Sequence, residues 1–317
     1  MTRAAVLLLA GASASGFAHA ATLRAGPGTD YPQPSAAIAA AAPGDTVALT
    51  PGTYYDCAVW STDRLTIDGG GAAVFSDRSC QDKAAFVVAG AGTVLRGITF
   101  TRQRVPDRNG AGIRLEGGSL AVEDCTFDDE EAALIAAARP GAELVLRRVT
   151  VRSVGVPGST LAAVTAGGAA ALRIEDSSFS DPRGDGGALR TDVPATVVGS
   201  SFSFGAGVSP VLEASGPLEV ASSVFHLSGS RPAAIRALGS GVTVRSTSLD
   251  GAAGALLLQD WSDSAPVLAG NRVSPGDTES SSAGYLVHRG KDAAHATVSS
   301  LRHMAGRMRD LLKTALR

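Results

Sequence analysis

The chain has 317 residues and a formal net charge of −2 at pH 7, with 44% hydrophobic and 5% aromatic residues. A slightly acidic chain with few aromatics lacks the organised basic face and stacking side chains that nucleic-acid binding needs, so we expect no nucleic-acid partner. Its 38 glycines favour a fold of tight corners and thin walls over a bulky globular core.

Residues 1–20 have the pattern of a secretory signal peptide. Arg3 precedes the apolar stretch from Ala4 to Leu9, and a run of small residues ends at Ala20. A membrane anchor is the competing interpretation, but the stretch is shorter than the roughly twenty apolar residues that a spanning helix needs. We therefore expect cleavage after Ala20, no transmembrane segment, and a secreted or periplasmic location in a bacterium.

The segment from Tyr31 to Thr53 predicts a cap for the N-terminal end of the fold. Ser35 can cap a short helix over the alanines that follow, and Pro43 with Gly44 ends that helix. A strand then begins at Val47.

A short segment in which apolar residues occupy every second position occurs nine times along the middle of the chain, at intervals of 23 to 28 residues. One copy could not bury its apolar face without a neighbour on either side, so the period predicts a solenoid. The copies end at Phe75, Phe100, Phe127, Val151, Phe179, Phe202, Phe225, Leu249 and Val273.

Within each copy the apolar residues lie two positions apart, as at Leu120 and Val122, which is the spacing of a strand with one buried face. A second apolar pair follows in most copies, so each coil is expected to hold two or three short strands. Leucine-rich and helical repeats need other spacings. The sequence therefore predicts an all-β fold, a single-stranded right-handed parallel β-helix that occupies residues 21–290 as one domain.

The start of this region resembles a known family. A helix that runs into AxxGDTVxLxPGTY, followed by LTIDGGG, is similar to the first coil of secreted bacterial β-helix proteins of the pectin lyase-like superfamily. The resemblance covers roughly Ala37 to Val273 and implies the parallel β-helix fold. Many members of the superfamily cut acidic polysaccharides.

The catalytic signatures of those enzymes are not found in the sequence. The NTD and GHG motifs of polygalacturonases and the RxPxxR run of pectate lyases are absent, and the DPHE motif of alginate epimerases is matched only by Asp181-Pro182-Arg183. Chondroitinase B-like lyases use a lysine with an arginine, and Lys83 is the only lysine before residue 291. Whether the protein is an enzyme therefore stays open.

Cys57 and Cys80 lie 23 residues apart, which is one repeat. Equivalent positions on adjacent coils are about 4.7–4.9 Å apart, close to the distance that a disulfide spans, and an exported protein meets an oxidising compartment. We expect a Cys57–Cys80 disulfide, with two free thiols as the alternative. Cys125 stands where other copies carry valine or serine and is expected to be a small buried residue.

Charged residues form two further columns beside the apolar line. Their sign alternates from coil to coil, which predicts solvated salt ladders, because neighbouring strands avoid like charges opposite each other. A hydrolytic carboxylate pair is the alternative, but Arg148 would neutralise both of its neighbours. The columns are Glu123, Arg147 and Glu175, and Asp124, Arg148 and Asp176.

A third column provides the candidate binding site. Arginines spaced along a flat wall can bind the carboxylates of a polyuronate bidentately, and they are also the candidate catalytic residues of a lyase. Acidic residues on the same face could orient a guanidinium or hold calcium. The alternative is a charge ladder in which Glu213 bridges Arg190 and Arg236. The column is Arg114, Thr165, Arg190, Glu213 and Arg236, and the added acids are Glu116 and Asp192.

No transition-metal spacing is visible, so no metal site is predicted, and calcium is the one cofactor left open. The acidic run at residues 128–131 follows a strand and is expected to be a solvated turn, with weak calcium binding as the alternative.

Residues 291–317 predict a basic amphipathic helix. Val298, Leu301, Ala305, Met308 and Leu312 recur every three to four residues. Five basic residues and Asp310 give residues 296–317 a charge of 5 − 1 = +4, whereas residues 21–295 carry −7, because Arg3 accounts for the remaining +1 of the total −2. This helix is expected to cap the solenoid, with contact to a membrane surface or a partner as the alternative.

These patterns predict an exported β-helix protein that binds or scaffolds at an extracytoplasmic polysaccharide or another surface component. A polysaccharide lyase-like enzyme that acts on an acidic glycan by β-elimination through the arginine column is the alternative, and a purely structural solenoid is the third possibility. An acidic polysaccharide or cell-surface glycan is the expected partner.

Overall fold

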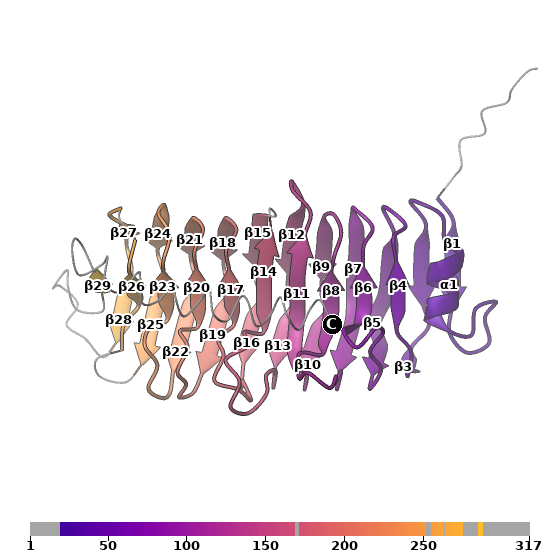
Figure 1. Cartoon of the computed structure of the whole chain (residues 1–317), viewed down its shortest axis with the longest axis horizontal. Helices are drawn as coiled ribbons and strands as arrows, with labels where there is room; N and C mark the ends of the chain where they lie inside the picture. Colours follow the sequence, from indigo (N-terminus) through magenta and orange to yellow (C-terminus); the bar gives the residue numbers. More distant parts are fainter. Residues whose placement is uncertain (1–19, 169–170, 252–254, 263, 275–284, 288–317) are drawn as a thin grey trace, which may run out of the picture.

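The computed structural model describes residues 20–168, 171–251, 255–262, 264–274 and 285–287. In this part of the chain the strands wind into an elongated solenoid whose coils lie side by side (Figure 1). Neighbouring strands pair in parallel and form one sheet of 19 strands and one of 10 strands. The predicted all-β parallel β-helix is therefore confirmed.

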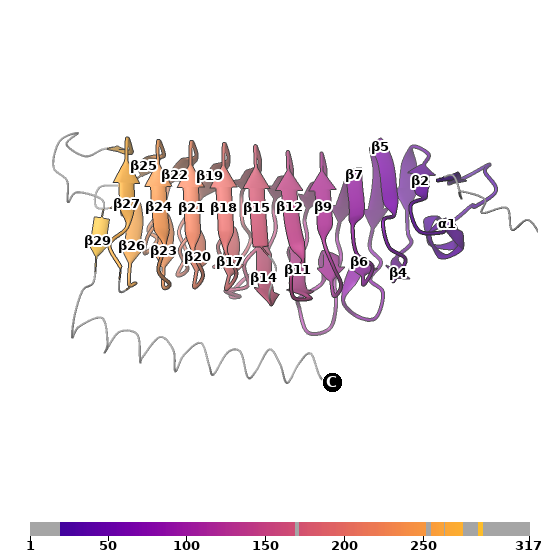
Figure 2. The same ribbon diagram turned by 90° about the horizontal axis from the view of Figure 1, so that it is seen from above.

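Each complete coil contributes to three faces, which we name the first face, the ladder face and the wall face. The first and ladder faces belong to the 19-stranded sheet, and the wall face is the 10-stranded sheet. In Figure 2 the strands of the first face and of the wall face follow one another along the long axis.

The first face contains β1 (Thr22–Ala25), β2 (Thr46–Leu49), the first parts of β5 (Thr66–Ser76) and β7 (Thr93–Thr101), β9 (Leu120–Glu123), β12 (Glu143–Arg147), β15 (Ala171–Glu175), β18 (Ala195–Val198), β21 (Leu218–Ala221), β24 (Val242–Arg245) and β27 (Val267–Ala269). The ladder face contains β3 (Gly52–Tyr54), the last parts of β5 and β7, β10 (Thr126–Asp128), β13 (Thr150–Arg152), β16 (Ser178–Ser180), β19 (Ser201–Phe204), β22 (Val224–Leu227), β25 (Ser248–Gly251) and β28 (Arg272–Ser274). The wall face contains β4 (Ala58–Trp60), β6 (Ala84–Val88), β8 (Ala111–Leu115), β11 (Ala132–Ala138), β14 (Val164–Gly168), β17 (Leu189–Thr191), β20 (Leu212–Ala214), β23 (Ile235–Ala237), β26 (Leu258–Asp260) and β29 (Tyr285–Val287).

The core is built around the line of residues that end the nine copies. Each pairs with its equivalent on the next coil, from Phe75 with Phe100 to Leu249 with Val273. The rings of Phe100 and Phe127 are stacked with their centroids 5.2 Å apart. The nine copies therefore stack in register, as the predicted solenoid requires, and we call this stack of residues the ladder.

The corner between the first and ladder faces uses one residue per coil with a positive φ. This left-handed conformation favours glycine and tolerates aspartate, but arginine and serine adopt it here as well. The residues are Gly97, Asp124, Arg148, Asp176, Gly199, Ser222, Ser246 and Gly270, with φ from 47° to 64°.

The residue after this corner points into the core and stacks from coil to coil. Ser200 is a representative member: its Oγ donates to the carbonyl of Val198 at 3.0 Å and accepts from the N–H of Ser177 at 3.2 Å. Cys125 occupies the same column with 1% exposure, and burial raises the pKa of its thiol to about 12. It is the small buried residue that the sequence predicts.

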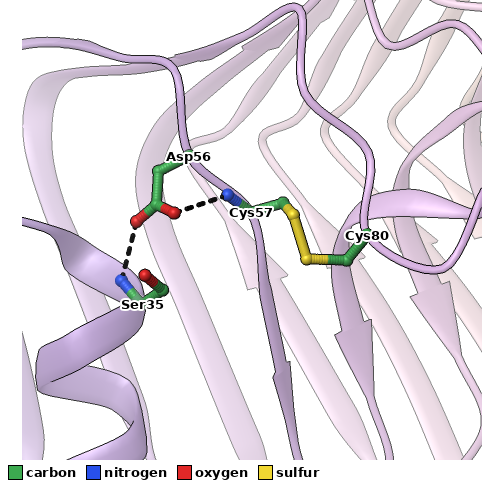
Figure 3. Close-up of a disulfide and its surroundings, with 4 residues drawn as sticks. All are labelled: Ser35, Asp56, Cys57 and Cys80. Atoms are coloured by element: carbon green, nitrogen blue, oxygen red, sulfur yellow. Dashed lines mark hydrogen bonds between the residues drawn. A yellow bond between two sulfur atoms is a disulfide. The ribbon is translucent and has the colours of Figure 1, made fainter.

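The N-terminal end is covered by α1 (Pro34–Ala40), which buries Ala37 and Ile38. Its N-cap is Gln33 rather than the expected Ser35, and Gln33 makes no side-chain capping hydrogen bond. Asp56 supplies the cap instead, because its Oδ2 accepts from the N–H of Ser35 at 2.8 Å (Figure 3). The capping acceptor is therefore the carboxylate of Asp56, 21 residues after Ser35 in the chain, and not the hydroxyl of Ser35 itself.

Cys57 and Cys80 form the predicted disulfide, with Cα atoms 5.6 Å apart. Figure 3 shows Cys57 directly after Asp56, so the disulfide and the helix cap hold the same stretch of chain. The disulfide ties this stretch to the loop before β6.

At the C-terminal end, Leu268 and Val273 are only partly buried against the core. Residues 1–19 of the predicted signal peptide and the predicted helix at 291–317 lie outside the described residues. Among the described residues, we find no helical segment with the length and hydrophobicity of a membrane span.

Candidate functional site

The outward column of the wall face brings together most of the residues that the sequence predicts, but in two separate groups. Ile135 pairs with Arg114 on one side and with Thr165 on the other. The five predicted residues therefore share one column, but Ile135, which the sequence analysis did not include, lies between Arg114 and Thr165. Arg114 lies three coils from Arg190, or about 14 Å along the axis.

The C-terminal group is a continuous chain of polar contacts. Glu213 accepts from Arg190 Nε at 3.0 Å and from Arg236 Nη1 at 3.3 Å. Gln259, which the sequence argument did not include, continues the column by accepting from Arg236 Nε at 2.8 Å. The guanidinium of Arg236 also lies over the ring of Trp261, 5.2 Å from its centroid. Glu213 thus bridges the two arginines, as the charge-ladder alternative requires.

The N-terminal group is centred on Arg114. Its Nη2 donates to Asn109 Oδ1 at 3.3 Å, while its buried Nε has no hydrogen-bond partner. Burial lowers the pKa of this arginine, and the charges of Glu116 and Asp107 oppose that effect. Among the ion pairs of the described residues, none involves Arg114.

Glu116 and Asp192 behave differently from each other. Glu116 accepts from Lys83 Nζ at 2.6 Å, so its carboxylate is bonded to the lysine of the preceding coil and not to Arg114. Desolvation raises the pKa of Asp192, and backbone hydrogen bonds, including that of Gly168, oppose the rise. Among the described residues, no group of three or more acidic, histidine or cysteine side chains could hold a metal ion.

The acidic run at residues 128–131 is not the solvated turn that the sequence suggests. Glu130 is fully buried and Glu131 is 6% exposed. Glu131 Oε2 accepts from the N–H groups of Val105 and Gly110, at 3.2 and 2.7 Å, and so closes the loop at residues 102–110. That loop supplies Asn109, the partner of Arg114.

Glu130 has no hydrogen-bond partner at either carboxyl oxygen. Burial raises the pKa of this carboxyl well above its usual range, and the charge of Arg104 only partly opposes the rise. Glu130 is therefore neutral in the folded protein over part of the pH range in which a solvated glutamate is charged.

A further set of ion pairs lies where the ladder face ends. Arg102 donates to Asp77 at 2.8 and 2.7 Å, which lowers the pKa of that carboxyl to about 2. Asp129 on the next coil accepts from Arg104 and from Arg183. These contacts pair Arg102 and Arg104 with carboxylates, whereas Arg108 donates to the carbonyl of Pro157 at 3.2 Å.

Of the two alternating columns, the column of Glu123, Arg147 and Glu175 is a complete salt ladder, whereas in the other column Arg148 pairs with Asp124 but, among the described ion pairs, not with Asp176. Arg147 Nε lies 2.8 Å from Glu175, and Arg147 Nη1 lies 3.4 Å from Glu123. Arg148 is bonded to Asp124 at 2.7 Å. Within these two columns of the described chain, Asp176 is the one carboxylate without an arginine partner, so the columns hold no pair of free carboxylates of the kind that glycoside hydrolysis needs.

A shallow groove of about 370 Å³ lies on the first face, away from the wall residues. It crosses β12, β15, β18, β21 and β24, and its lining includes Glu143, Arg173, Pro194, Pro217 and Glu219. No strong sequence signal marks it, because its polar lining consists of ordinary outward positions of successive strands, such as Arg173, Thr196 and Glu219.

No protein-family model matches the sequence, and no curated protein sequence matches it. Among solved structures, the alginate lyase from Paenibacillus sp. str. FPU-7 gives a TM-score of 0.61 at 15% identity, over 85% of this chain and 99% of that chain. The pectin methylesterase from carrot gives a TM-score of 0.45 at 13% identity, over 86% and 89% of the two chains. The likeness to the alginate lyase shows a shared parallel β-helix fold, as the resemblance in the sequence implies.

Proposed function

We propose that the protein is exported and binds an acidic polysaccharide along the wall face, as a non-catalytic binding or scaffolding protein. The observation that carries the proposal is Arg114, a partly buried guanidinium without a carboxylate partner among the described residues and with an unsatisfied Nε. A desolvated cation without a partner is unfavourable, and a uronate carboxylate would supply the missing acceptors.

The C-terminal group would extend the same site along the axis. Glu213 holds Arg190 by its Nε, and the Arg190 side chain remains 33% exposed. A guanidinium that is already oriented loses less entropy when it binds a carboxylate. Arg190 and Arg236 lie two coils apart, about 9–10 Å, so an extended polymer could contact both.

The contacts favour binding over β-elimination. A lyase needs a general base close to the neutralised carboxylate. Lys83 is paired with Glu116 at 2.6 Å, and the wall column contains no tyrosine or histidine among its described members. The disulfide between Cys57 and Cys80 supports export, because such bonds persist in oxidising compartments.

The test is a binding and product assay on the purified protein with pectate, alginate, hyaluronan and chondroitin, with and without calcium. We expect one polyuronate to be bound without release of an unsaturated product. Arg114→Met should raise the Kd about tenfold, the typical effect of losing a charge-assisted hydrogen bond, and Arg190→Ala should weaken binding with little effect on folding. Arg148→Met, which removes an arginine from another face, is the matched control.

Equal binding by the wild type, Arg114→Met and Arg190→Ala would remove the wall from consideration. Ultraviolet-absorbing unsaturated product from the wild type would instead establish the lyase alternative. Binding that disappears with a chelator would indicate calcium as a bridging ion. Failure to bind any polymer would leave the structural solenoid as the remaining function.

A further inference from the structure

Asp45 is a nearly buried carboxylate at the N-terminal end of the solenoid, only 7% exposed. It directly precedes β2, whose Thr46 pairs with Thr66 of the next coil. The residue before Thr66 is Leu65, which is fully buried. Asp45 therefore occupies a place where the next coil buries an apolar side chain, and a buried charge in such a place needs compensation.

The compensation in the structure comes from two backbone groups. Asp45 Oδ1 accepts from the N atom of Ala21 at 2.8 Å, and Oδ2 accepts from the N–H of Ala42 at 2.8 Å. Among the ion pairs of the described residues, none involves Asp45. The carboxylate thus has hydrogen bonds but no countercharge.

Ala21 is held at both of its backbone polar atoms. Its carbonyl accepts from the N–H of Thr46 at 2.8 Å, while its nitrogen faces Asp45. The next residue begins β1, the outermost strand at this end (Figure 1). Ala20 and Ala21 are both exposed, so the peptide bond between them is accessible.

We propose that the Ala20–Ala21 bond is hydrolysed during export and that the new α-ammonium group of Ala21 forms an ion pair with Asp45, which locks β1 onto the first coil. The proposal rests on the export that forms part of the proposed function. A signal peptidase would add water across the bond: the water oxygen joins the carbonyl carbon of Ala20, the C–N bond breaks, and the released amine takes up a proton.

The charge follows from ordinary acid–base chemistry. An α-amino group has a pKa of about 8 and is mostly protonated at neutral pH. The amide N–H that now donates to Asp45 would become a charged donor, and charge-assisted hydrogen bonds are roughly twice as strong as neutral ones. Removal of the leader would therefore supply the countercharge that Asp45 lacks.

The first test is the mass of the exported protein after expression of the full chain in a bacterium. We expect an N-terminus at Ala21. A mature protein that begins at another residue, or one that retains the leader after export, would overturn the proposal.

The second test compares two forms of the purified protein, one beginning at Ala21 and one carrying a Gly-Ala extension before it. The extension keeps an amide at Ala21 and moves the ammonium away. We expect the extended form to have an unfolding equilibrium constant about tenfold larger at pH 6, measured by urea denaturation. In an Asp45→Asn background the two forms should differ less than twofold, whereas Asp30→Asn, an exposed carboxylate of the same end, should preserve the difference.

A pH series provides a readout that does not depend on Asp45→Asn folding well. Pairing raises the folded-state pKa of the amine, so the extra stability is fully present below its unfolded pKa of about 8 and is lost as pH rises through the folded value. Equal stability of the two forms at pH 6, or a difference unchanged above the pKa of the amine, would refute the ion pair. Both forms should bind polyuronate equally, so failure of the wall proposal and failure of this one give different results.

Discussion

Phe127 shows what a single residue contributes to the ladder. Its side chain is 1% exposed and stacks on Phe100, with Val151 behind it on the next coil. We expect Phe127→Ala to lower the free energy of unfolding by about 3–5 kcal/mol, because the cavity cannot collapse between two fixed coils. Urea denaturation measures the change, and Thr126→Ala, on the outer side of the same strand, should have a much smaller effect. A negligible loss for Phe127→Ala would contradict the internal ladder.

Because Glu130 is buried, we expect the free energy of unfolding to depend on pH in an unusual way. Its pKa is raised in the folded state by burial, so the folded protein holds a proton that the unfolded chain releases. The stabilising contribution is therefore complete below the unfolded pKa of about 4.3 and is lost as pH rises towards the folded pKa. Glu130→Gln should remove this decline, as urea titrations between about pH 5 and pH 8 would show. A steeper decline in Glu130→Gln than in the wild type would refute the assignment.

The limits of sequence reasoning are also clear at single residues. The ladder and the salt columns could be predicted because apolar and charged residues mark opposite sides of each strand. Ile135 was missed because β11 reads AALIAAA and contains no polar residue that marks its outward positions. The partners of Arg114 and Glu116 were missed for another reason: Asn109 and Lys83 are brought in by loops, whose paths the repeat period does not determine.

At the level of elements, α1 is stabilised from outside its own sequence. The sequence correctly predicts a short helix over the alanines, but Ser35 cannot cap it because Pro34 already begins the helix. The cap comes from Asp56, which is next to a disulfide that only the repeat geometry could suggest.

We expect Asp56→Ala to destabilise the protein by about 1 kcal/mol, the usual cost of losing an N-cap acceptor. Differential scanning calorimetry or urea denaturation measures the change. Asp30→Ala, which removes an exposed carboxylate at the same end of the solenoid, should leave stability within about 0.5 kcal/mol of the wild type. Equal effects of the two substitutions would show that Asp56 does not act as the cap.

For the whole molecule, the two ends of the solenoid differ. The N-terminal end is covered by α1, whereas Leu268 and Val273 at the other end are less buried than Val244 and Leu249 one coil earlier. The expected amphipathic segment at residues 291–317 follows this end in the chain, and its role as a cap stays a prediction.

Deletion of residues 291–317 should lower the Tm by about 2–4 °C for each 1 kcal/mol of packing lost, if the segment covers the last coil. In the full-length chain, Leu301→Asp should reproduce part of the loss, while Ser300→Asp, on the polar side of the expected helix, should not. An unchanged Tm together with lost binding to anionic lipid vesicles would favour the membrane-surface alternative.

Charge alternation from one coil to the next also restricts how such a protein can change in length. Asp77, Arg102 and Asp129 follow this order at one corner, and Arg190, Glu213 and Arg236 follow it on the wall face. Insertion or loss of a single coil within either series would place like charges on adjacent strands, whereas two coils would preserve the order. In these regions, duplication during evolution, or lengthening by design, should therefore be tolerated in even numbers of coils.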